Sequence, residues 1–374
     1  MTKPIARASA TRPLGDSEPV SAFVRACRRM TTDRTPVWLM RQAGRYMTEY
    51  RNLRAKHSML DLVRTAELAA EITLQPVAAF DVDAAIIFSD LLPPLVGMGL
   101  KLEYVSGDGP VIHNPIERPE DVARLTVTSP HETMGGTLRA IELVAAELQS
   151  KKVPVIGFAG APFTLASYAI EGRGSRNYAK VKSFMRCEPG AWSGLMNRLV
   201  DMLVDYLRAQ AESGASALQV FDSWAGQALG AQDYERFVAP YNQRLFSALG
   251  TIDVPVINFS TGTAAYIDRV AECGGDVVGV DWRMPIDTLW ERIGHARAIQ
   301  GNLDPVALLA SWPVLAREID DVLARCAGRP GHIFNVGHGV LPGTPVGNVR
   351  RLVDYVHERT SEITKDQKKD DRCA

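Results

Sequence analysis

At 374 residues, the chain is long enough for one large domain or two ordinary ones, and either can bury a sizeable hydrophobic core. Its 42 basic and 43 acidic residues give a formal charge of −1, so no global field favours nucleic acid or an anionic membrane surface. No apolar run approaches the roughly 18 residues that a membrane helix needs, and scattered cysteines without a C-x-x-C pair argue for a reducing, cytoplasmic setting and against a disulfide framework or structural zinc.

The two ends of the sequence are predicted to lie outside the folded domain. Residues 1–20 are polar and mixed and have no apolar h-region, so we interpret them as a disordered tail and not as a secretory signal. Residues 363–374 form a polar C-terminal tail dominated by charge. The intervening residues 21–362 contain no low-complexity linker, which indicates a single domain. Within it, segment 171–180 has glycines, arginines and little apolar content, as a mobile loop would.

Short apolar runs alternate with longer segments of helical periodicity along the chain. The runs cover residues 36–40, 84–88, 153–159, 217–222, 254–259, 276–282, 299–303 and 332–336. Between them, a segment such as 192–206 repeats apolar residues every three or four positions, the period of an amphipathic helix. This alternation predicts a single-domain (β/α)₈ barrel of the α/β class, because a doubly wound sheet usually has fewer strands and a phosphate-binding glycine turn after the first.

The first apolar run leads directly into Arg41, Gln42, Ala43, Gly44 and Arg45. Two guanidiniums surround a glycine that lets backbone N–H groups approach a ligand, and each planar guanidinium can hold a carboxylate through two parallel bonds. The pattern therefore suits a polyanionic small molecule. Two surface salt bridges at the start of a helix explain it about equally well.

Polar residues also follow the later runs, at the strand ends where a barrel of this kind places its active site. Asp90 follows Ser89 at the end of the second run and precedes the apolar residues 91–94. A carboxylate in such surroundings is costly unless another group pairs with it. Asp90 is therefore the first candidate for a functional carboxylate. Two structural alternatives remain: a cap on the following helix or an ion pair with Arg41.

Three further polar residues carry weaker signals. Tyr168 ends the motif after the third run, where a tyrosine commonly packs with its hydroxyl tied to backbone. Ser223 follows Asp222 in FDSWAG, where a turn residue is more usual than a nucleophile. His338 lies between two glycines and fits a general base, a ligand or a turn residue, and no Cys or His beside it completes a metal site. P-loop, G-x-S-x-G and H-E-x-x-H motifs are absent from the sequence.

Taken together, these segments closely resemble the uroporphyrinogen decarboxylase family of haem biosynthesis. The resemblance spans about residues 25–360 and lies in PVWLMRQAGRYMTEYR, AAFDVDAAIIFSDLL, GFAGAPFTLASY, FDSWAG, QGNLDP and FNVGHGVLPGTP. It implies a single-domain (β/α)₈ barrel, usually a homodimer, that needs no metal or organic cofactor. It also implies that the four acetate side chains of uroporphyrinogen III are decarboxylated to methyls, which gives coproporphyrinogen III and four molecules of CO2.

The resemblance also assigns roles to the candidate residues. It implies a substrate site formed by Arg41, Gln42, Ala43, Gly44, Arg45, Asp90, Tyr168, Ser223 and His338. Of these, Asp90, Arg41 and Tyr168 are the expected catalytic residues, and Asp90 would accept hydrogen bonds from the pyrrole N–H groups. We assign Arg41 first to carboxylate binding, because a guanidinium is a poor general acid.

Two other functions fit parts of the pattern. Corrinoid-related methyltransferases of the same superfamily carry a zinc site of His and Cys, but the corresponding stretches INFSTGT and FNVGHGV contain no cysteine. A non-catalytic tetrapyrrole-binding protein would have lost Asp90 and kept the arginines, and Asp90 is present. The expected partners are therefore uroporphyrinogen III and a second copy of the chain, without nucleic acid or membrane.

Overall fold

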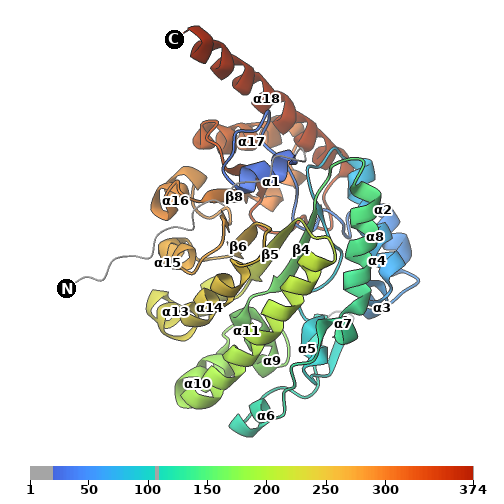
Figure 1. The fold of residues 1–374 in the computed structure, drawn as a ribbon, viewed down its shortest axis with the longest axis vertical. Coiled ribbons are helices and arrows are strands. Elements are labelled where there is room, and N and C mark those ends of the chain that lie inside the picture. The colour runs from blue at the N-terminus through green and yellow to red at the C-terminus, as the bar shows by residue number, and fades with distance from the viewer. Residues whose placement is uncertain (1–19, 106–108, 374) are drawn as a thin grey trace, which may run out of the picture.

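A sheet of seven parallel strands lies at the centre of the computed structural model, in the order β1-β4-β5-β6-β7-β8-β9 (Figure 1). The structure describes residues 20–105 and 109–373, with residues 362–373 as backbone only. Almost every position of these strands is buried, which explains why the strands read as continuous apolar runs. The strands are β1 (Ala85–Ile86), β4 (Val155–Gly160), β5 (Ala217–Asp222), β6 (Val256–Ser260), β7 (Val277–Gly279), β8 (Ala298–Leu303) and β9 (His332–Val336).

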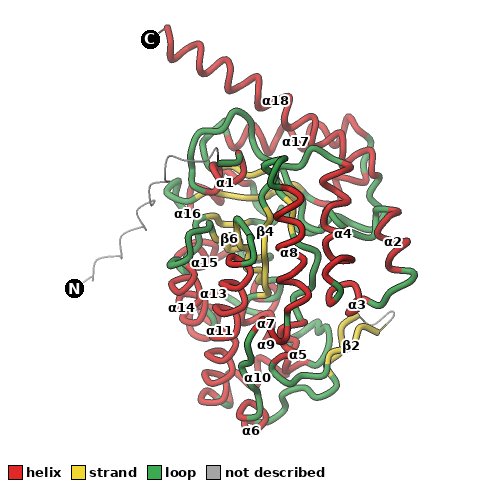
Figure 2. Tube along the Cα trace, turned by 45° about the vertical axis from the view of Figure 1, so that its right-hand side comes forward, coloured by secondary structure: helices red, strands yellow, loops and turns green. Residues whose placement is uncertain are grey.

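Helices connect the strands and surround the sheet (Figures 1 and 2). The predicted amphipathic segment 192–206 lies within the longest of the internal helices, which packs against β4 and several helices, most extensively the helices 162–171 and 239–249. The α-helices are α1 (Ala22–Cys27), α2 (Thr48–Arg54), α3 (Met59–Arg64), α4 (Ala66–Ala79), α5 (Pro93–Gly97), α6 (Pro119–Ala123), α7 (Pro130–Thr133), α8 (Gly135–Leu148), α9 (Pro162–Glu171), α10 (Ala179–Cys187), α11 (Pro189–Glu212), α12 (Ala225–Ala228), α13 (Ala231–Phe237), α14 (Ala239–Leu249), α15 (Ile267–Glu272), α16 (Ile286–Ile293), α17 (Trp312–Cys326) and α18 (Val346–Cys373). The 3₁₀-helices are η1 (Ala264–Tyr266) and η2 (Pro305–Leu309).

The first predicted strand, residues 36–40, is reduced to a single parallel bridge between Val37 and Phe334 of β9. Side chains take the backbone donors that a longer ladder would use: the Leu39 N–H donates to Gln42 Oε1 over 3.0 Å, and the Met40 N–H donates to Asn335 Oδ1 over 3.0 Å. The chain therefore leaves the sheet early.

The single bridge nevertheless joins the two edges of the sheet. On its other side, the Asp83 N–H, just before β1, donates to the Val37 carbonyl over 2.8 Å. Residues 36–38 thus occupy the position between β9 and the start of β1. The predicted (β/α)₈ barrel is confirmed, with an irregular first strand.

An antiparallel hairpin lies outside the barrel sheet and is absent from the sequence-based expectations. It consists of β2 (Leu102–Val105) and β3 (Gly109–Ile112), and β2 is visible beside α3 in Figure 2. The hairpin follows α5, and its Tyr104 side chain reaches the region around Asp90. A missed element thus contributes to the candidate site described below.

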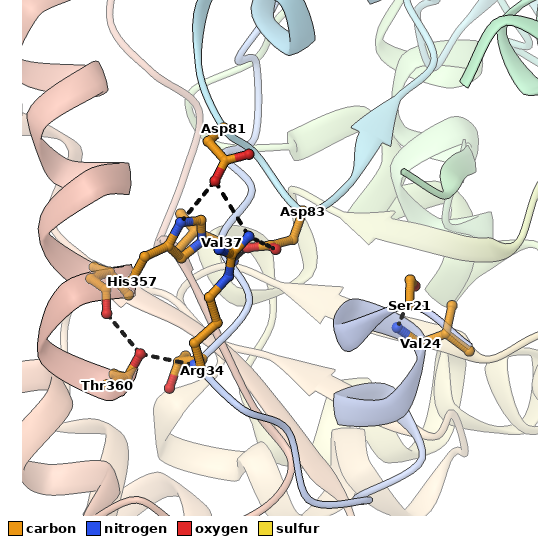
Figure 3. Close-up of polar contacts among 10 residues, drawn as sticks. Ser21, Val24, Arg34, Val37, Asp81, Asp83, His357 and Thr360 are labelled. Atoms are coloured by element: carbon orange, nitrogen blue, oxygen red, sulfur yellow. Dashed lines mark hydrogen bonds and ion pairs between the residues drawn. The ribbon is translucent and has the colours of Figure 1, made fainter. Parts of the chain in front are cut away.

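A cluster of charged residues fastens the barrel at the amino ends of its strands, and we call it the closing cluster (Arg34, Asp81, Asp83 and His357; Figure 3). Asp83 Oδ2 lies 2.7 Å from His357 Nε2 and 2.7 Å from the Val37 nitrogen, and its Oδ1 lies 3.0 Å from Arg34 Nη2. Burial alone would raise the pKa of Asp83. The hydrogen bond and charge of His357, together with Val37 and Arg34, outweigh burial and lower it. Because His357 belongs to α18, the cluster ties the C-terminal helix to the first strand position.

The chain ends and segment 171–180 complete the description. Residues 1–19 of the predicted N-terminal tail lie outside the described residues, and residues 363–373 of the predicted C-terminal tail continue α18 as far as Cys373. Segment 171–180 connects α9 to α10, and within it Tyr178 is buried. No helix among the described residues has the length and apolar character to cross a membrane.

Candidate active site

The predicted site residues gather at one end of the barrel, which we call the mouth. Each follows the carboxyl end of a strand position: Arg41 after residues 36–40, Asp90 after β1, and Ser223 directly after β5. Tyr168 lies on α9 after β4, and His338 lies in the loop after β9. Because the strands are parallel, their carboxyl ends face the same way and bring these distant segments together.

The turn at residues 41–45 presents its two arginines to solvent and turns its glutamine inward. Arg41 adopts a left-handed backbone conformation with φ of 61° at the start of the turn. The Gln42 side chain is buried, and its Nε2 donates to the carbonyl of Ala84, beside β1, over 3.0 Å. Gln42 therefore holds the turn against the barrel, while Ala43 and Gly44 are half-buried.

Arg41 lies against the loop that carries His338. A side chain at Gly339 would collide with Cδ of Arg41, so the glycine permits this close approach. The pKa of His338 is lowered, first by burial and then by the charges of Arg41 and Arg283, with Asp281 acting in the opposite direction. His338 is therefore neutral near pH 7. No group of three or more His, Cys, Asp or Glu that could hold a metal ion occurs in the described part of the chain.

Asp90 is half-buried, and few of its hydrogen-bond acceptor sites are used by other groups of the protein. Its Oδ1 accepts a hydrogen bond from the Leu92 N–H over 3.1 Å in the loop before α5, but α5 has no side-chain cap, so the capping alternative is wrong. The alternative of an ion pair with Arg41 is wrong, because none of the ion pairs within 20–105 and 109–361 involves Asp90. The carboxylate keeps lone pairs for a ligand.

Two tyrosines share the surroundings of Asp90. Burial, and then the charge of Asp90, raises the pKa of Tyr168 to about 12, although Arg41 opposes the shift. The same two causes raise the pKa of Tyr104. The Tyr104 hydroxyl is buried and faces Asp90, yet it makes no hydrogen bond of good geometry within the described chain. Both phenols stay protonated at neutral pH, so two uncharged hydroxyl groups lie in the surroundings of Asp90.

Ser223 is held in place through a buried hydroxyl and carboxyl. The Ser223 N–H donates to Thr164 Oγ1 over 2.9 Å, and Thr164 Oγ1 donates to Asp222 Oδ1 over 3.0 Å. Asp222 is buried, its Oδ2 has no well-formed hydrogen bond within the described residues, and burial raises its pKa to about 6. The sequence analysis gave Asp222 no role of its own, although its place at the last position of β5 was a usable signal.

A cavity of about 260 Å³ opens beside Ser223 and His338. It contains residues that the sequence interpretation missed, above all Arg283, which resembles an ordinary surface arginine when only the sequence is read. The residues that line it are Ser223, Trp224, Gln227, Thr261, Trp282, Arg283, Asp304, Pro305, Val306, His338 and Leu341. The arrangement at the mouth is therefore a largely unpaired carboxylate with arginines around it, suited to a ligand that carries both N–H donors and carboxylates.

Known proteins are similar to this chain over most of its length. A family model described as uroporphyrinogen decarboxylase (URO-D) matches residues 18–359. Uroporphyrinogen decarboxylase of Chloroflexus aurantiacus is 54% identical over 338 residues, 89% of this chain and 94% of that protein. The enzyme of the same name from Roseiflexus sp. (strain RS-1) is 52% identical over 347 residues, 91% of this chain and 99% of that protein.

Solved structures of more distant proteins share the fold. A methyltransferase from Methanosarcina mazei superposes with a TM-score of 0.74 at 18% identity, over 91% of this chain and 99% of that one. A B12-independent methionine synthase from Shewanella sp. W3-18-1 gives 0.54 at 9% identity, over 83% and 91%. At these identities the likeness supports the barrel alone.

Proposed function

Because the chain belongs to the uroporphyrinogen decarboxylase family, we propose that it removes CO2 from the four acetate side chains of uroporphyrinogen III and releases coproporphyrinogen III. The observation that carries this proposal is Asp90. It is a half-buried carboxylate with one backbone hydrogen bond and no ion pair within the described chain, and arginines stand on the rim around it. A ring of pyrrole N–H donors with carboxylates on its periphery complements this arrangement.

Substrate binding is assigned to the rim. Arg41 and Arg45 expose their guanidiniums, and each can bind a substrate carboxylate through two parallel hydrogen bonds. Gln42 supports the turn from below, and Ala43 and Gly44 offer backbone at the mouth. The turn therefore holds the periphery of the ring while its centre faces Asp90.

Decarboxylation requires an electron sink, and the pyrrole ring of the substrate supplies it. A proton added to the ring carbon next to the acetate-bearing carbon makes the pyrrole an iminium-like cation. The bond to the carboxylate then breaks, its electron pair neutralises the cation, and CO2 leaves. The exocyclic methylene takes up a proton and the ring carbon gives one back, so that one hydrogen replaces CO2 overall. No metal or organic cofactor is needed for this sequence of steps.

Asp90 acts electrostatically in this scheme. Its fixed negative charge faces the position where positive charge develops on the ring, and the largely buried Tyr104 and Tyr168 lie in its surroundings. Tyr168 stays protonated and can donate a hydrogen bond to the acetate that reacts. The neutral His338 and the Ser223 hydroxyl line the adjoining cavity, and we assign them to orienting other side chains.

We assign the active form to a cytoplasmic homodimer, because the resemblance to the family implies a homodimer. The formal charge of −1 offers little electrostatic resistance to self-association. Analytical ultracentrifugation at micromolar concentration tests this directly, and a monomer under those conditions contradicts it.

The decisive experiment incubates purified protein with uroporphyrinogen III under anaerobic conditions and counts product carboxylates by mass spectrometry. We expect stepwise loss of four carboxyl groups, and the same result after exhaustive dialysis against a chelator. Activity that disappears on chelation and returns with zinc favours the methyltransferase-like alternative. Tight binding of the ring without release of CO2 favours a non-catalytic tetrapyrrole-binding protein.

A further inference from the structure

We infer that Arg283 is an additional anion-binding residue and that it holds a propionate carboxylate of the substrate on the side of the mouth opposite Asp90. The identity of this anion rests on the proposed function. The cation and its cavity belong to the barrel itself.

The order of the strands places Arg283 across the mouth from Asp90. Asp90 follows β1, and Arg283 follows β7. In the ring formed by the sheet and residues 36–38, three strand positions separate β1 from β7 in either direction. Arg41 and Arg45 follow the position next to β1, so they leave the far side of the mouth to other cations.

Arg283 is held in a fixed orientation by buried groups. Asp281, 3% exposed, forms an ion pair with Arg283 Nη1, and its Oδ1 accepts a hydrogen bond from the Arg283 backbone N–H over 3.1 Å. The other carboxylate oxygen also accepts from the Gly262 N–H over 2.6 Å. The guanidinium carbon lies 4.4 Å from the centre of the Trp282 ring. An ion pair on one side and an aromatic ring on another remove much of the freedom that a surface arginine has.

The guanidinium keeps hydrogen-bonding capacity for a ligand. Within the described chain, its side-chain hydrogen bond goes to Asp281 through Nη1, and a guanidinium carries five N–H donors. Its side chain is 45% exposed and borders the 260 Å³ cavity. Ser223, Gln227 and His338 border the same cavity, so hydroxyl, amide and imidazole groups surround a carboxylate bound there.

One negative charge also faces this cavity and has to be reconciled with anion binding. Asp304 Oδ1 accepts a hydrogen bond from the Val306 N–H over 2.9 Å at the start of η2. Part of the carboxylate charge is therefore balanced by backbone N–H groups. The half-exposed Arg283 guanidinium borders the same cavity, and its charge lowers the pKa of His338 there.

The proposed reaction favours propionate over acetate as the group bound by Arg283. The acetates are consumed one after another, so the pattern of acetates around the ring changes in every round. The propionates persist through all four rounds. A fixed cation remote from Asp90 contributes to every round only if it binds a group that is always present.

The test compares the kinetics of Arg283→Gln and Arg283→Lys with those of the wild-type protein. Glutamine can still donate to Asp281, so the buried carboxylate keeps a partner while the positive charge is lost. The matched control is Arg325→Gln on α17. Arg325 forms an ion pair with Asp321 over 2.7 Å and does not line the cavity. We expect KM for uroporphyrinogen III to rise by at least about tenfold in Arg283→Gln, the factor for one charge-assisted hydrogen bond. Arg283→Lys recovers part of the loss, kcat changes by less than about twofold, and the control matches wild type.

Inhibition by coproporphyrinogen III separates the two kinds of side chain, because this product has propionates and no acetates. We expect its inhibition constant to rise by the same factor as KM in Arg283→Gln. An unchanged inhibition constant overturns the assignment to propionate, and an unchanged KM at low salt overturns the anion site. Failure of the wild-type protein to decarboxylate uroporphyrinogen, in contrast, refutes the proposed function. Direct binding of coproporphyrinogen III, followed by tryptophan fluorescence, then still tests whether Arg283 binds a carboxylate.

Discussion

Asp83 at one end of the barrel and Asp222 and Asp90 at the other end are paired to different degrees. At the amino ends of the strands, Asp83 places both oxygens on hydrogen-bond donors and has a lowered pKa. At the mouth, Asp222 leaves one oxygen without a well-formed hydrogen bond within the described residues and has a raised pKa, and Asp90 accepts only one backbone hydrogen bond there. Asp83 is fully paired within the protein, whereas Asp90 and Asp222 at the mouth are not.

This difference separates stability from function within one fold. The lowered pKa of Asp83 means that its ionised form stabilises the native state, and removal of one partner of such a pair leaves the other uncompensated. Incompletely paired groups cost stability, and the cost is tolerated where a ligand later makes the missing bonds. We therefore expect equivalent carboxylate-to-amide substitutions to lower stability at the closing cluster, and to affect activity or even raise stability at the mouth.

The largest effect is expected for Asp90→Asn, which keeps the shape of the side chain and removes the charge. Loss of one preorganised electrostatic partner lowers turnover by about 10²–10³-fold. The Asn oxygen can still accept from the Leu92 N–H, so the free energy of unfolding should change by less than about 0.5 kcal/mol. Steady-state decarboxylation and urea denaturation measure the two quantities.

A surface substitution of the same kind serves as the control for Asp90→Asn. Asp201 on α11 pairs with Arg244 in an exposed ion pair, and Asp201→Asn should match wild type in both measurements. Near-wild-type turnover of Asp90→Asn would falsify the electrostatic role of Asp90.

The next largest effect is expected for Asp83→Asn in the closing cluster. The substitution leaves Arg34 and His357 without their buried anion and should lower the free energy of unfolding by about 2 kcal/mol at pH 7. Turnover per folded molecule should stay at the wild-type value. Asp320→Asn is the control, because Asp320 pairs with Arg359 in an exposed position.

The pH dependence of Asp83 follows from its lowered pKa. The folded state releases this proton more readily than the unfolded state, so the stabilisation is complete above about pH 4 and is lost as the pH falls through the folded pKa. The stability difference between wild type and Asp83→Asn should therefore shrink under acid. A difference that is equal at pH 3 and pH 7 contradicts the ionic origin.

A smaller effect is expected for Arg45→Ala and Arg41→Ala at the mouth. Each variant should raise KM for uroporphyrinogen III by about tenfold, since one charge-assisted contact to a carboxylate is lost. The effect should weaken with added salt, because both side chains are exposed and screening reduces the attraction. Arg124→Ala, which removes an exposed arginine paired with Asp121, is the control. If KM is unchanged in both variants at low salt, the rim does not bind the substrate.

The smallest effect is expected for Asp222→Asn, and its sign is opposite to that of Asp83→Asn. With a pKa of about 6 in the folded state, Asp222 holds its proton more tightly there than in the unfolded state. Its ionisation therefore does not lower the free energy of unfolding below about pH 4, and lowers it fully above pH 6. The amide removes this penalty but weakens the bonds from Thr164 and Ala225. We expect a net stabilisation of about 1 kcal/mol at pH 7 and none at pH 4. Denaturation at both pH values measures it, and destabilisation at pH 7 shows that Asp222 is better paired than its geometry indicates.

Sequence reasoning predicted the barrel and much of the candidate site because both depend on local patterns. Buried parallel strands appear as apolar runs, and residues at their carboxyl ends, such as Asp90 and Ser223, can be read directly from the sequence. The shortened first strand could not be predicted. It depends on Asn335, almost the whole barrel away along the chain, which takes the backbone N–H of Met40.

The missed site residues have the same explanation. Arg283 becomes a site residue through the buried Asp281 and the ring of Trp282, neighbours whose orientation no sequence pattern shows. Tyr104 reaches Asp90 only because a hairpin outside the barrel folds back toward the mouth. Tertiary contacts decide such positions, and periodicity and spacing do not record them.

The bridge between Val37 and Phe334 also has a consequence for folding during synthesis on the ribosome. The turn that carries Arg41 is anchored by Asn335 and by the hydrogen bond from the Val340 N–H to the Met40 carbonyl, so it takes shape only after β9 has been synthesised. The early segment therefore lacks its partners on and after β9 until nearly the last part of the chain emerges. A prematurely terminated chain lacks these two anchors of the Arg41 turn as well as its final helix.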